Sequence, residues 1–136
     1  MSEAGPAAGT TTKIRPGPVA TTEPLVDPDA LARLVQEVGC DGARRFVVRF
    51  RAALGRRLAE LHHALRNIDL AAAYDVALNL SSGAAMVGAP RLAATAGEIA
   101  ARLRLTLGPS RDDLQALLRL ARETDAELGR LLHEQP

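Results

Sequence analysis

The chain has 136 residues, of which 47% are hydrophobic and 2% aromatic, and its formal net charge is +1. This length allows one domain with its own core and leaves little room for a second. A nearly neutral chain has no strong field for nucleic acid or an anionic membrane, so we expect neither partner. The lone cysteine excludes a disulfide within the chain. The sequence has no apolar run of about 18 residues, so no transmembrane helix is predicted.

Residues 1–24 consist mainly of Pro, Gly, Thr and Ala and have few side chains that a core could bury. This composition cannot offset the entropy lost on ordering the chain, so we expect a disordered segment. The segment lacks the apolar stretch of a secretory signal, which favours a cytoplasmic location. We expect the structured domain over residues 25–136.

The first two predicted helices differ in length. Asp27 as N-cap and Pro28 at the first helical position begin a short helix, and Gly39 ends it. A longer helix follows over about residues 41–67. Its apolar stripe consists of Phe46, Val47, Phe50, Leu54, Leu58, Leu61, Leu65 and Ile68.

Three more helices complete the chain. Asp69 caps one over residues 70–87, and another follows over about residues 91–107. Ser110 and Asp113 resemble a capping box at the start of the last helix. No segment alternates as a strand does. The sequence therefore predicts an all-α fold, an antiparallel four-helix bundle with a short extra helix across one end.

The helix predicted over residues 70–87 has an unusual outer face. At about 100° per residue, one side carries the expected buried stripe of Ala73, Ala77, Leu80, Ala84 and Val87. Leu78 lies about 160° from Leu80 on such a helix, so we expect it to be exposed. Its neighbours are small or carry hydroxyl groups, which lets another protein approach closely, although an Ala-rich composition produces the same pattern. The candidate docking residues are Ala71, Tyr74, Leu78, Ser81, Ser82 and Ala85.

Residues 77–92 read ALNLSSGAAMVGAPRL. This stretch resembles the motif of the histidine phosphotransfer (HPt) domains of bacterial phosphorelays, which reads roughly Ala-His-x-Leu-Lys-Gly-Ser-Ser-x-x-x-Gly-Ala-x-x-Leu. Phe50 and residues 61–69 are similar to the family's lead-in, so the resemblance covers about residues 25–133. The motif positions that match are packing and turn positions, namely Ala77, Leu80, Gly88, Ala89 and Leu92.

The departures from this motif fall on the residues that carry its chemistry. Leu78 occupies the position of the phosphoacceptor His, and Ser81 occupies that of the Lys. Leu78 has no nucleophilic atom and Ser81 supplies no charge, so phosphotransfer at this position is chemically excluded. The resemblance thus implies a non-catalytic pseudo-HPt protein that binds a receiver domain or a histidine kinase through this face. We expect a monomer with no cofactor, no metal and no enzymatic activity.

Two alternatives remain open. His63 lies about 180° from the apolar stripe, with Arg66 three residues later, and is a candidate non-standard phosphoacceptor. More commonly, adjacent residues such as His62 and His63 are simply solvated, and no partner residue at metal-binding spacing completes a site. The other alternative is a helical adaptor unrelated to phosphorelays.

Overall fold

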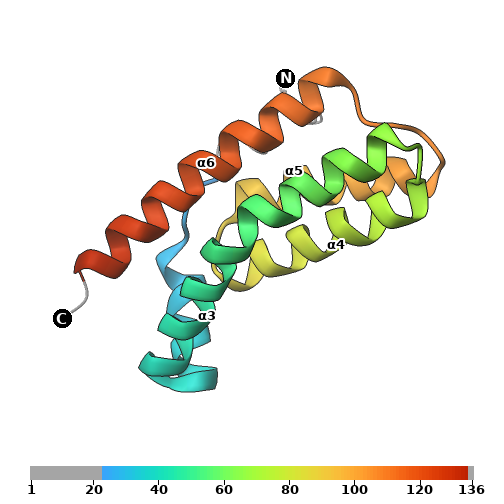
Figure 1. The fold of residues 1–136 in the computed structure, drawn as a ribbon. Coiled ribbons are helices and arrows are strands. Elements are labelled where there is room, and N and C mark those ends of the chain that lie inside the picture. Colours follow the sequence, from blue (N-terminus) through green and yellow to red (C-terminus); the bar gives the residue numbers. More distant parts are fainter. Residues whose placement is uncertain (1–22, 135–136) are drawn as a thin grey trace, which may run out of the picture.

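The structure is a computed structural model that describes residues 23–134, so nearly all of the predicted disordered segment, residues 1–24, lies outside the described residues. The described part contains α3 (Pro28–Arg66), α4 (Leu70–Met86), α5 (Pro90–Arg104) and α6 (Arg111–Glu134). Figure 1 shows them as helices joined by short turns, with no strand over this range. The predicted all-α class is therefore confirmed.

α3 consists of two helical arms. Asp27 caps its start, because its carboxylate accepts a hydrogen bond from the backbone N–H of Asp29 at 3.0 Å. Gly39 has φ 81° and ψ 167°, which is not helical, and the chain changes direction there (Figure 1). This confirms the predicted short first helix. We call residues 28–38 the N-terminal arm and residues 40–66 the long arm.

The ends of α3, α4 and α5 share one type of turn. Ile68, Gly88 and Thr106 follow these helices with φ values of 54°, 78° and 58°. At each end, two backbone N–H groups fold back onto carbonyls of the last helical turn, as in a Schellman motif. Ile68 is therefore a turn residue that is 78% exposed, and its placement in the apolar stripe is corrected. The same turn ends α5 at Arg104, three residues before the predicted end.

The helices of residues 23–134 form a closed ring in which α4 lies between α3 and α5, and α6 lies between α5 and α3. Leucine, isoleucine, valine and alanine side chains from all of them fill the centre. The N-terminal arm packs at the end where α4 turns into α5, and the Asp27 N–H donates to the Gly88 carbonyl at 2.6 Å. None of the helices in this range has the length and apolar character needed to cross a membrane.

α6 is joined to α3 by a polar contact that the sequence pattern does not reveal. The Arg51 Nε donates to Asp125 Oδ1 at 2.9 Å. Its guanidinium lies against Gly129, where an added Cβ would be 2.8 Å from Arg51 Nη2. Thr124, one residue before Asp125, is fully buried.

Candidate functional site

The inner face of α4 is as the sequence predicts. Asp69 caps the helix, and its carboxylate accepts a hydrogen bond from the Ala72 N–H at 3.1 Å. The stripe of small and aliphatic residues that faces the core is almost completely buried, namely Ala73, Ala77, Leu80, Ala84 and Val87. Because this stripe sets the rotation of the helix, it also decides which residues face outward.

The outer face of α4 is centred on Leu78, which is 44% exposed. Ala71, Ser82 and Ala85 are exposed on the same face, and Tyr74 is half-buried at its edge. The structure therefore brings five of the six candidate docking residues together on one helix face. This set, Ala71, Tyr74, Leu78, Ser82 and Ala85, is called the outer patch below.

Ser81 differs from the prediction. It is half-buried, and its hydroxyl donates a hydrogen bond to the Ala93 carbonyl of α5 at 2.9 Å. A Cβ at Gly97 would lie 3.2 Å from the Ser81 Oγ, so the two helices approach closely here. The hydroxyl is therefore used inside the bundle, and Ser81 is removed from the docking set.

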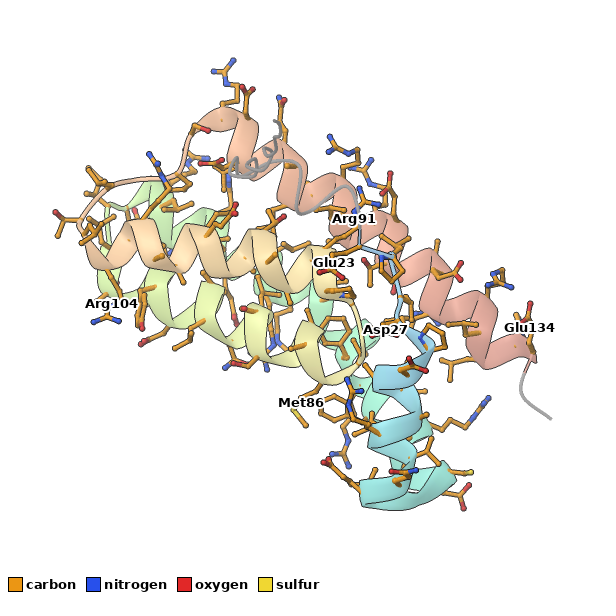
Figure 2. The ribbon with its side chains drawn as sticks, turned by 180° about the vertical axis from the view of Figure 1, so that it is seen from behind. Glu23, Asp27, Met86, Arg91, Arg104 and Glu134 are labelled. Carbon is orange, nitrogen blue, oxygen red and sulfur yellow. The ribbon has the colours of Figure 1, made fainter. Side chains whose placement is uncertain are left out.

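Met86 is an exposed residue that the sequence analysis did not include. It is 49% exposed at the end of α4. Figure 2 shows it projecting from the helix beside the N-terminal arm, and Met86 and Ala85 share a shallow hollow with Ala30 and Arg33 of that arm. The outer patch thus borders the N-terminal arm at this hollow, which Glu37 of the arm also lines. The signal in the sequence was its helical spacing of four residues from Ser82.

A second feature is the groove between α3 and α4. It has a volume of about 480 Å³, and Asn79 and Gly83 line it from the α4 side. A Cβ at Gly83 would lie 3.2 Å from the ring of Phe50, so the glycine lets this ring pack against α4. Arg49, Arg56 and Arg57 line the same groove from α3. The sequence alone does not single out these three arginines, because the groove that they line forms only when α3 and α4 pack together.

His63 lies away from the outer patch. It is exposed on α3 and lines a separate hollow with Ala72 and Val76 of α4, which Leu78 does not line. Its Nε2 lies 3.0 Å from the Asn67 amide nitrogen, a hydrogen bond that the neutral imidazole can accept. His62 and His133 are exposed. Within residues 23–134, no cluster of three or more His, Cys, Asp or Glu side chains could hold a metal ion.

Among the described residues, an ion-pair cluster with a resolved effect on a pKa lies on α6, which is not adjacent to α4 in the ring. Arg130 forms ion pairs with Glu127 and Glu134. The hydrogen bond from Arg130 holds the pKa of Glu127 below its ordinary value. On α4 itself, Asp75 is the single charged residue. The outer patch therefore offers an aliphatic centre with two hydroxyl groups around it, and it has no imidazole and no cation.

The described residues thus form an HPt-like all-α bundle, with the exposed aliphatic side chain of Leu78 on its third helical segment, α4. The chain matches no protein-family model and no curated protein. Its fold is similar to the crystal structure of histidine-containing phosphotransfer protein B from Pseudomonas aeruginosa PAO1, with a TM-score of 0.75. The two share 24% sequence identity, over 83% of this chain and 98% of that one. At this level of identity, the similarity establishes the architecture.

Proposed function

We propose that this chain is a phosphorelay signal-transduction protein that binds a receiver domain, or a histidine kinase, without accepting phosphate at the motif position. The observation that carries the proposal is Leu78, exposed at the centre of the outer patch where the HPt motif has its His. The HPt-like fold supports a phosphorelay role, and the printed name of the similar protein describes a phosphotransfer protein.

The outer patch has the physical character of a protein-docking surface. Burying an exposed Leu side chain against a partner contributes about 1–2 kcal/mol. The neighbours Ala71, Ser82 and Ala85 are small, so a partner helix can approach the α4 backbone closely. A patch with an aliphatic side chain at its centre and small residues around it suits protein binding better than phosphotransfer.

The same residues oppose phosphate acceptance. Phosphotransfer from an aspartyl phosphate needs a nucleophilic atom, and Leu78 has none. It also needs positive charge near the developing phosphoryl oxygens, whereas the charged residue of α4 is Asp75. A chain of this kind can hold a receiver domain or cover its phosphorylation site without receiving the phosphoryl group.

The binding test uses purified receiver domains encoded in the genome of the source organism, each immobilised in turn for surface plasmon resonance. Leu78→Arg is expected to weaken binding at least tenfold, because it removes apolar burial and places a charge in the interface. Leu118→Arg is the matched control, since Leu118 is 46% exposed on α6, which is not adjacent to α4 in the ring. Circular dichroism checks that both variants keep the native helix content.

Equal binding by native chain and Leu78→Arg would show that the outer patch is not the docking face. Failure of every receiver domain and histidine kinase to bind the native chain would favour the unrelated helical adaptor instead.

Phosphate acceptance is tested separately by incubating the native chain with a phosphorylated receiver domain and separating the products on a Phos-tag gel. We expect no phosphorylated form of this chain. A phosphorylated band that disappears in His63→Ala would assign acceptance to His63 and overturn the non-catalytic part of the proposal.

A further inference from the structure

Five of the seven arginines of the long arm fall into two sets by the helix they face. On the α6 side, Arg44 donates to the Leu132 carbonyl at 3.2 Å and Arg51 pairs with Asp125. On the α4 side, Arg49, Arg56 and Arg57 line the α3–α4 groove. The arginines of the first set bond to α6 and so help to hold the bundle together. The arginines that line the groove have a different role.

The positive charges of the arginines on the α4 side are poorly balanced by nearby carboxylates. Arg56 has a carboxylate of Glu60 at 3.9 Å, and both side chains are more than half exposed, so this pair is weak. Among residues 23–134, no carboxylate lies within 4.0 Å of the Arg49 or Arg57 guanidinium nitrogens. The α4 side of the groove supplies Asn79 and Gly83, which are neutral. The rim of the groove therefore carries excess positive charge.

The floor of the groove is apolar. Phe46 and Phe50 of α3 and Leu80 of α4 line it, and Gly83 lets the Phe50 ring lie against α4. Asn79 joins the groove to the outer patch, because it follows Leu78 directly and is exposed. A partner docked over Leu78 would extend onto this floor and meet the arginine rim.

We propose that the α3–α4 groove binds an acidic amphipathic segment of the protein that docks on the outer patch. This inference rests on the proposed function and adds the chemistry of the partner. Arg49 and Arg56 are seven residues apart, which places them about 10 Å apart along the helix axis. Arginines in a row fit carboxylates spaced along a segment, whereas a small anion would need donors that converge on one point. Guanidinium groups pair with carboxylates through two parallel hydrogen bonds.

The groove and the outer patch then have separate effects on binding. Burial of Leu78 provides affinity that depends little on salt. Charges at a partly exposed rim mainly raise the association rate and fix the orientation of the partner, and salt weakens both effects. Changes in the groove should therefore appear in the association rate and in its salt dependence.

The test compares the double variant Arg49→Gln/Arg57→Gln with the control Arg119→Gln/Arg122→Gln, whose arginines are exposed on α6. Each is measured by surface plasmon resonance against the receiver domains used above, at several salt concentrations. The groove variant is expected to bind about tenfold more weakly, mostly through slower association, with a shallower salt dependence. The control is expected to stay within about twofold of the native chain.

If the groove variant and the control bind with the same affinity, association rate and salt dependence, the groove inference is wrong. If Leu78→Arg weakens binding in the same experiment, the proposed function stands without it.

A second experiment, with a synthetic peptide, tests the groove inference if no receiver domain binds. The probe is a synthetic helical peptide with a leucine face and glutamates seven residues apart, and its control has glutamine at those positions. In NMR titrations of the native chain, the acidic peptide is expected to shift the signals of Arg49, Arg57 and Phe50 more than the control peptide does. Equal shifts from both peptides, or shifts elsewhere only, overturn the inference.

Discussion

At the scale of single residues, two β-branched side chains occupy backbone positions that favour glycine. Ile68 and Thr106 have φ values of 54° and 58°, and both follow the last residues of a helix. An L-residue in the left-handed region costs about 1–2 kcal/mol relative to its usual conformation. Ile68 is 78% exposed, so little burial offsets this cost. The sequence predicted a break near Ile68, but its apolar side chain wrongly suggested a core position.

Ile68→Gly is expected to stabilise the protein by about 0.5–1 kcal/mol. The gain is the removed strain minus the larger entropy that glycine has in the unfolded chain. Urea denaturation followed by circular dichroism measures it. Thr106→Gly should act in the same direction, whereas Asn67→Gly should not, because Asn67 has φ of −92° and its side chain bonds to His63. Destabilisation by Ile68→Gly would show that the Ile68 side chain contributes more to stability than its exposed fraction indicates.

At the scale of elements, α4 is the helix on which local sequence signals agree best. Its cap, its buried stripe and its end at Gly88 were all predicted, because each depends on residues within a few turns. The need for glycine at position 88 has an additional tertiary cause. A Cβ there would lie 2.9 Å from the Asp27 carbonyl oxygen and 3.1 Å from the Ala30 Cβ. Gly88 thus allows the N-terminal arm to pack against the α4–α5 turn.

Gly88→Ala is expected to destabilise the protein by about 2–3 kcal/mol, because the left-handed φ and the contact with a rigid backbone both oppose the methyl group. The measurement is the urea midpoint. Gly55→Ala is the control with the opposite sign. It lies in the exposed middle of α3 with nothing within 4 Å of the added Cβ, and should gain about 1 kcal/mol. A neutral Gly88→Ala would contradict both the cost of the left-handed φ and the cost of displacing the N-terminal arm.

At the scale of the whole molecule, the described helices close into a ring only where α6 meets α3. Arg51 and Asp125 join the two helices across 74 positions in the sequence. Gly129 lies one turn after Asp125 and leaves room for the guanidinium. None of these residues stands out in the sequence, because their relationship exists only after the ring has formed.

The double-mutant cycle of Gly129→Ala with Arg51→Met tests this contact. In the native background, the added methyl displaces the guanidinium, so the usual helix gain of about 1 kcal/mol should be cancelled. In the Arg51→Met background, which keeps an apolar stem without the guanidinium, Gly129→Ala should recover that gain. Urea denaturation gives the coupling energy, expected to be about 1 kcal/mol. A coupling energy near zero would show that the Arg51 guanidinium can move away from residue 129 with no loss of stability.

The sequence alone determined the helices of this protein, most of their ends and the rotation of α4. These properties depend on caps and on a period of about 3.6 residues, which act over short distances along the chain. The period places Leu78 opposite the core, but it does not say which helix stands on which flank of α4. That choice depends on the handedness of the ring, because a mirror-image arrangement buries the same stripes. Only the tertiary structure decided that Ser81 faces α5, that Arg51 reaches α6, and that Arg49 and Arg57 line a groove beside the outer patch.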